Sequence, residues 1–189
     1  MILPGIIKLA WGRAKGIDEF SSSAEAFAAS LAPLIAFPLV GAVITGLQGS
    51  WKLAILEFLS RICTVLVLPV VTYEFARLFN RQSQWLRTAT ALNWCFWLVV
   101  PAVLLAAIAG SMIAQFGLPI ERVAIVVIGV AALYLLWNRW FILKSGLQIS
   151  GWRAAIVVLA IMLLVAVLAG LPYVVGLSMT GMHVGTHLG

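Results

Sequence analysis

Glu57 and Arg61 are ionisable side chains within a stretch that is otherwise strongly apolar. Their spacing places them on one face of a helix, where a carboxylate and a guanidinium can pair. Charges in lipid are costly and often functional. Counted from Leu53, they lie about 6 and 12 Å inside the stretch. They are therefore a candidate intramembrane polar site, unless the span begins near Phe58 and leaves both at the headgroups, or the pair only locks two helices together.

Two further polar side chains interrupt later apolar stretches. Asn93 carries an amide, which seeks a hydrogen-bonding partner on another helix when it lies in lipid. We expect it to be a packing contact, and we keep it as the third residue of the candidate polar site. Arg139 lies between Asn138 and Trp140. We expect its guanidinium to extend to the cytoplasmic surface and to stack on an indole ring.

A candidate metal site lies near the C-terminus. Two thioethers and two imidazoles occur there close together, from Met179, Met182, His183 and His187. Such ligands suit a soft ion such as Cu(I). Gly181 and Gly185 disfavour the helix that would align the two imidazoles, so an irregular tail is the favoured interpretation. These two histidines are the only ones in the sequence, which excludes a histidine-ligated haem within the bilayer for this chain alone. We expect no metal and no cofactor.

Recognisable catalytic motifs are absent from the sequence. There is no HExxH, GxSxG, Walker loop, CxxC or glycine-rich nucleotide fingerprint. An enzyme is therefore the least supported class of function, and no catalytic or cofactor-binding residue is predicted.

The composition identifies the medium in which these residues must be positioned. Of 189 residues, 63% are hydrophobic and 10% are charged, whereas soluble domains carry about 25% charged residues. So few charges cannot coat a water-soluble globule. A soluble enzyme, a nucleic-acid-binding protein and a disordered chain are all poor interpretations, and the chain is predicted to be an integral membrane protein.

Five apolar stretches are long enough to cross a bilayer as helices. They cover residues 24–47, 53–75, 88–116, 123–143 and 154–177. The apolar residues are continuous rather than alternating, which favours helices over a barrel. Ser22-Ser23-Ala24-Glu25 resembles a capping box immediately before the first stretch. We expect an all-α polytopic protein with a five-helix bundle over residues 24–177.

The two ends of the chain differ from this domain. In residues 1–23, Leu3, Ile6, Ile7, Ala10, Ala14 and Ile17 would share one helical face. This pattern is typical of an interfacial amphipathic helix, although Gly12 and Gly16 leave an irregular segment as an equal alternative. Residues 178–189 would form a C-terminal periplasmic tail.

Basic residues gather in alternate connections. Nine of them would lie on one side: Lys8, Arg13, Lys15, Arg77, Arg81, Arg87, Arg139, Lys144 and Arg153. The other side would have Lys52 and Arg122. The positive-inside rule then places the N-terminus in the cytoplasm and, with five spans, the C-terminus outside. The net charge of +6 mostly reflects this distribution of basic residues, and the same residues could also bind anionic lipid headgroups.

Several segments carry a family resemblance. They are Phe20 to Phe27, Glu57-Phe58-Leu59, Pro69 to Arg81 and Ala91-Leu92-Asn93-Trp94. With them the chain resembles small integral membrane proteins of alphaproteobacteria, which are distantly similar to the Yip family of five-span proteins. The resemblance implies a bacterial inner membrane and a five-helix bundle, and it implies no catalytic or ligand residues.

The favoured function is association within the inner membrane, either as the accessory subunit of a membrane complex or as a Yip-like homo-oligomer. The expected partners are the lipid bilayer and other membrane proteins or further copies of the chain, not nucleic acid. The alternative is a small transporter or channel, whose polar path would be lined by the second and third spans. Cys63 and Cys95 should lie at different depths, so no disulfide is expected.

Overall fold

The computed structural model describes residues 2–49, 51–115 and 119–185, with side chains described except at 53, 114, 120, 169 and 171–185. Helices account for nearly all of it: α1 (Ile2–Ala10), the 3₁₀ helix η1 (Ala14–Glu19), α2 (Ala24–Leu47), α3 (Trp51–Leu78), α4 (Gln82–Cys95), the 3₁₀ helix η2 (Phe96–Leu98), α5 (Val99–Ala114), α6 (Ile120–Gly146) and α7 (Gly151–Gly185). Five helical segments are long and apolar enough to cross a membrane, which confirms the all-α, five-span prediction.

The observed boundaries extend those predicted from hydropathy. α2 has the predicted bounds, but its N-cap is Ser23, whose hydroxyl accepts a hydrogen bond from the Ala26 amide at 3.2 Å. The N-cap is therefore one residue later than the expected capping box of Ser22 and Glu25 would place it, and Ala26, three residues after Ser23, has no side chain that could complete such a box. The other spans are longer than predicted, because helices continue past the apolar stretch wherever polar side chains can project into water. α7 likewise continues to Gly185, through residues expected to be an irregular tail.

The third span is not one regular helix. It consists of α4, η2 and α5, with the short 3₁₀ turn at Phe96–Leu98. Pro101 follows this turn and lacks the amide hydrogen that would bond to the carbonyl of Trp97. Loss of this bond accounts for the tightened backbone, since 3₁₀ turns commonly occur where an α-helix is interrupted.

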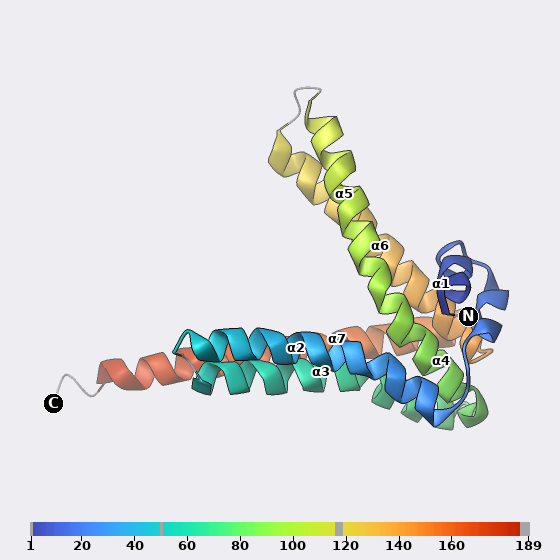
Figure 1. The fold of residues 1–189 in the computed structure, drawn as a ribbon, viewed down its shortest axis with the longest axis horizontal. Helices are drawn as coiled ribbons and strands as arrows, with labels where there is room; N and C mark the ends of the chain where they lie inside the picture. Colours follow the sequence, from blue (N-terminus) through green and yellow to red (C-terminus); the bar gives the residue numbers. More distant parts are fainter. Residues whose placement is uncertain (1, 50, 116–118, 186–189) are drawn as a thin grey trace.

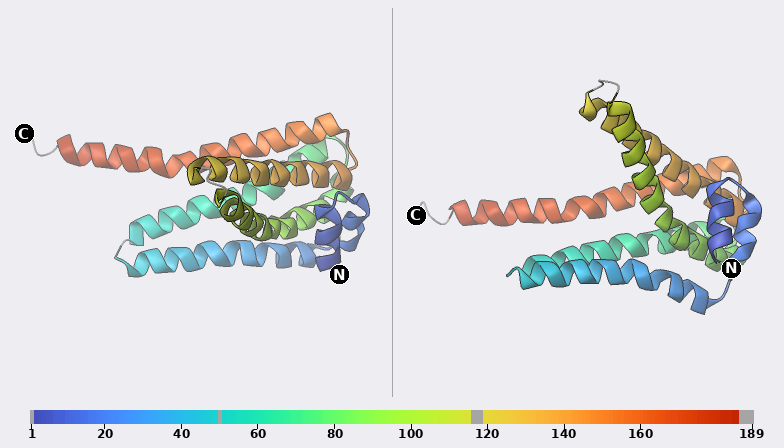
Figure 2. Two further views of the ribbon diagram at one scale, coloured as in Figure 1. Left: turned by 90° about the horizontal axis from the view of Figure 1, so that it is seen from above. Right: turned by 45° about the horizontal axis from the view of Figure 1, so that its top comes forward.

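The spans form an open bundle with two arms (Figure 1). α2, α3 and α7 run together as one arm, with α3 packed against both others. α5 and α6 form a second arm that points away from the first, and the right-hand view of Figure 2 shows the same separation. The arms are joined at one end, here called the core end, where α4 packs against α1, α2, α3 and α6.

The buried core lies at this core end. Its buried apolar residues come from α1, η1, α3, α4, α6, α7 and the connections beside them: Leu9, Ile17, Phe20, Ala76, Ala91, Leu92, Cys95, Ile142, Leu143, Leu147, Ile149, Ala154, Val157, Val158 and Ile161. Gly146 allows α6 to approach α4 closely, because a Cβ atom there would lie 2.5 Å from Thr88 Oγ1. The helices are therefore held firmly at one end.

The N-terminal segment is helical and docked on the protein, but it is not one continuous helix. Gly12, with φ of +70°, ends α1, and the amides of Gly12 and Arg13 bond to the carbonyls of Leu9 and Lys8. This is a Schellman ending. η1 then folds back on α1, and Lys8 pairs with Glu19. The ammonium of Lys8 donates a hydrogen bond to Glu19 and lowers the pKa of that carboxyl below its ordinary 4.5.

α1 packs on the protein through residues that the sequence pattern did not single out. Gly5 and Leu9 are buried, whereas Leu3, Ile7 and Trp11 are exposed. Two α6 side chains hold the end of α1: Asn138 Nδ2 donates to the Leu9 carbonyl at 3.1 Å, and Tyr134 Oη donates to the Ala10 carbonyl at 3.0 Å. The exposed stripe of Leu3, Ile7 and Trp11 remains available to lipid, as expected of an interfacial helix.

Candidate functional site

Glu57 and Arg61 do not pair with each other. Glu57 is half-buried and Arg61 is exposed on α3, and the ion pairs among the described side chains join other residues. Both lie near the turn between α2 and α3, with Glu57 about 9 Å from the start of α3. The two residues lie on one helix, as predicted, but their spacing of four residues did not bring the carboxylate and the guanidinium into contact.

Asn93 lies in a different part of the molecule. It is fully buried, and its Nδ2 donates to Ser30 Oγ on α2 at 2.9 Å. Ser30 in turn donates to the Phe27 carbonyl at 2.6 Å. Ser30 is about 26 Å from the end of α2 at which Glu57 is found. Asn93 thus makes a polar contact between α4 and α2, and the structure does not bring the three candidate residues together.

Arg139 has surroundings that sequence reasoning missed. It lines a small cavity of about 10 Å³ together with Leu68 of α3, Leu92 of α4, Leu143 of α6, and Val158, Ile161 and Met162 of α7. No hydrogen bond or ion pair of Arg139 is present among the residues with described side chains. A charge at the centre of a membrane span costs about 2.5–3.5 kcal/mol on membrane-insertion scales, and Arg139, nearer the end of its helix, costs less.

The two residues that flank Arg139 are engaged elsewhere. Asn138 is buried and bonds to the Leu9 carbonyl. Trp140 donates from Nε1 to the Gly151 carbonyl at 2.8 Å, and Lys144 Nζ lies 5.1 Å from the centroid of its ring. The indole stacking predicted for Arg139 is therefore made by Lys144. Arg139 also lies within α6, about 10 Å before its end, not in the following connection where the charge count had placed it.

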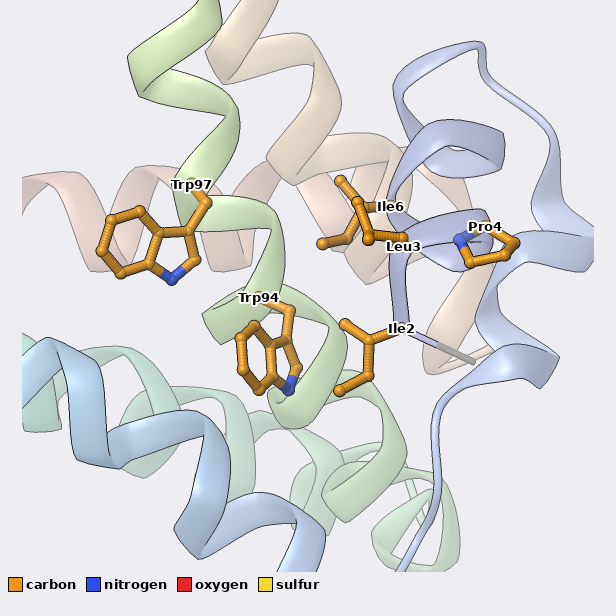
Figure 3. A pocket seen from close by; sticks show the side chains of 6 residues that line it. All are labelled: Ile2, Leu3, Pro4, Ile6, Trp94 and Trp97. Carbon is orange, nitrogen blue, oxygen red and sulfur yellow. The ribbon is translucent and has the colours of Figure 1, made fainter.

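An open apolar groove lies between α1 and the third span (Figure 3). It holds about 660 Å³ and is lined by Ile2, Leu3, Pro4 and Ile6 of the α1 helix, and by Trp94 and Trp97 of α4 and η2. Trp97 also packs edge-on against Phe37 of α2, with ring centroids 5.3 Å apart. The lining is almost wholly apolar, so the groove offers contact area and no group that could act as an acid, base or nucleophile.

The remaining predicted sites can be placed as follows. Cys63 is exposed on α3 and Cys95 is buried in α4, and both are free thiols, as expected. The side chains of Met179, Met182 and His183 and the whole of His187 lie outside the described residues. Within the part whose side chains are described, no group of three or more histidine, cysteine, aspartate or glutamate side chains could hold a metal ion.

No family model matches the chain, and comparisons with curated proteins and with solved structures give no match.

Proposed function

We propose that this integral membrane protein works by association, as an accessory subunit of a larger membrane complex. The observation that carries the proposal is the separation of its two arms (Figure 1). α5 packs extensively against α6, whereas its contact with α2, α3 or α7 is at most marginal in the part of the chain that the structure describes. Val103, Leu104 and Leu105 of α5 are each more than half exposed. Three successive exposed positions cover most of the helix circumference, so α5 has room for helices of another protein.

A Yip-like homo-oligomer belongs to the same proposal, because a second copy could also fill the space between the arms. A small transporter is the alternative from the sequence. Its polar path would need Glu57, Arg61 and Asn93 near one another, and the burial of Asn93 against Ser30, far from Glu57, does not favour it.

Extraction from native membranes tests the association directly. In a mild detergent or a membrane-solubilising polymer, the protein component of the particle should have a mass well above the 20.4 kDa of one chain. Mass determination by light scattering, followed by identification of the other protein components, measures both the size and the composition. A particle that contains one chain and no other protein would contradict the proposal.

The proposed location is the bacterial inner membrane, with the N-terminus in the cytoplasm. Arg13, Lys15, Arg77, Arg81, Lys144 and Arg153 are exposed at the core end, where they could also meet anionic lipid headgroups. Reporter cysteines test this orientation in a background where Cys63 and Cys95 have been replaced. Reporters at Ser83 and Ser145 should be protected from an impermeant reagent in intact spheroplasts, and one at Thr186 should react. The reverse labelling would invert the proposed topology.

A further inference from the structure

Arg139 lies where the two arms begin to separate. Upstream of Asn138, the middle turns of α6 contain no fully buried side chain, whereas Ile142, Leu143 and Leu147 downstream are buried in the core. Among the side chains of α7 that the structure describes, which extend to residue 170, the buried ones end at Ile161. The cavity beside Arg139 is therefore at the inner corner of the space between the arms, and Met162 at this corner is 46% exposed.

The position of this corner is well inside the spans. Arg139 is about 10 Å from the end of α6, and Val158 and Ile161 are about 10 and 15 Å from the start of α7. The Cα–Cβ bond of a helical residue tilts toward the helix N-terminus, which for Arg139 means away from the core end. The guanidinium therefore lies inside the span, about two helical turns from its end, near the level where Tyr134 and Asn138 hold the end of α1.

The chain itself supplies no acid at this depth. Asp18 contacts Arg87, Glu19 pairs with Lys8, and Glu74 pairs with Arg77 at 3.1 Å. Glu25 is in the first turn of α2 at the core end.

The two remaining carboxylates are nearer the far ends. Glu57 is about 31 Å from the end of α3, and Glu121 is in the first turn of α6. A second copy in the same orientation therefore brings no unpaired carboxylate to the level of Arg139.

From these positions we infer that Arg139 binds an aspartate or glutamate on a membrane span of a different protein, which enters the space between the arms. The inference rests on the proposed function and identifies the chemistry of the partner. A guanidinium can donate two parallel hydrogen bonds to one carboxylate. The cavity of about 10 Å³ has room for one water at most, so the carboxylate reaches Arg139 from the open side and not from within the core.

A synthetic membrane span of defined sequence tests this pairing. The probe is a leucine–alanine host span with one glutamate at its centre, which lies at nearly the same depth whichever way the span is oriented. The matched host has glutamine there. Association with the full chain is measured by energy transfer in phosphatidylcholine nanodiscs, with and without phosphatidylglycerol. The variants are Arg139→Met and, as a matched control on the exposed far end of α6, Arg122→Gln.

We expect the glutamate host to bind about three- to tenfold more tightly than the glutamine host, in the range of polar contacts between membrane helices. The preference should disappear in Arg139→Met and persist in Arg122→Gln. Equal binding of both hosts to the parent chain would overturn the inference, as would a preference that survives Arg139→Met. A preference abolished by phosphatidylglycerol would also overturn it, because a lipid phosphate would then occupy the site.

Stability of the isolated chain provides the second measurement. Since Arg139 has no partner of its own among the described side chains, Arg139→Met should unfold in detergent at the same temperature as the parent or higher. A clear decrease would mean that Arg139 holds its own helices together, contrary to the inference. If native extraction yields a larger complex while the hosts bind equally, only the role of Arg139 fails and the proposed function stands.

Discussion

Charged side chains on one face of a helix need not form a unit, as Glu57 and Arg61 illustrate. They lie one turn apart on α3, but the structure shows no ion pair between them. The effects of Glu57→Gln and Arg61→Leu on thermal stability in detergent should therefore add, with a coupling energy below about 0.5 kcal/mol. A double variant that recovers most of the loss caused by either single change would show that the two groups do pair.

A substitution at Ser30 tests the buried hydrogen bond between α2 and α4. Ser30 accepts from Asn93 and donates to the Phe27 carbonyl. Ser30→Ala should cost about 1–3 kcal/mol, because the buried Asn93 amide loses its partner.

Ser111 provides a matched control for this change. It donates to the Ile108 carbonyl of its own helix in the same way, but it is exposed and receives no bond from another helix. Ser111→Ala should stay within about 0.5 kcal/mol of the parent. Equal effects of the two changes on the unfolding midpoint would show that the hydrogen bond of Asn93 does not stabilise the contact between α4 and α2.

Among the elements, α4 and α6 owe their close approach to one glycine. A Cβ atom at Gly146 would lie 2.5 Å from Thr88 Oγ1, and Thr88 is fully buried. Gly146→Ala should lower stability by about 1–3 kcal/mol through overpacking. Gly129 is on the same helix and would meet nothing within 4 Å, so Gly129→Ala should be neutral or slightly stabilising. Thermal unfolding of both variants in one detergent compares them, and a tolerated Gly146→Ala would contradict this packing.

The docking of η1 on α1 should depend on pH. Lys8 lowers the pKa of Glu19, so the pair contributes fully above pH 4.5 and its contribution is lost as the pH falls through the lower pKa of the folded state. Amide exchange of residues 2–19, corrected for intrinsic rates, should therefore accelerate below pH 4.5. Lys8→Met should weaken protection already at neutral pH and reduce this dependence, whereas Lys15→Met, a change at an exposed lysine, should not. Identical pH profiles for parent and Lys8→Met would exclude the pair.

For the molecule as a whole, hydropathy was sufficient to predict the number, type and approximate bounds of the spans, since lipid imposes length and helical structure together. The pattern could not show how the helices separate, because apolar positions facing lipid and those facing a helix look alike in a strongly apolar chain. For a related reason the pattern could not show which residues of α1 pack on the protein. The reversal at Gly12 brings Gly5 and Leu9 against the protein, and a continuous helical wheel cannot represent that reversal.

For the candidate site, too, the sequence could not show which side chains contact one another. Residue types singled out Glu57, Arg61 and Asn93, yet their burial and partners depend on neighbours distant in the sequence. Arg139 was assigned to a connection because basic residues before a polar turn usually reach the surface. Its cavity is formed by four helices, and Leu68 and Met162, which both line it, are far from Arg139 in the sequence. The sequence nevertheless indicated that Arg139 has no ion-pair partner on its own helix, since no acidic residue lies within one helical turn of it.

The separation of the two arms in native membranes is the measurement that tests the proposed association most directly. Spin labels at Val43 of α2 and Ile108 of α5, both exposed and in the far halves of their helices, report this separation after replacement of Cys63 and Cys95. In nanodiscs extracted with native partners, the label distance should clearly exceed the interaxial distance of packed helices, about 10 Å, and remain narrowly distributed, because partner helices hold the arms apart. A short distance, with α5 packed on α2 in a closed five-helix bundle, would contradict the account.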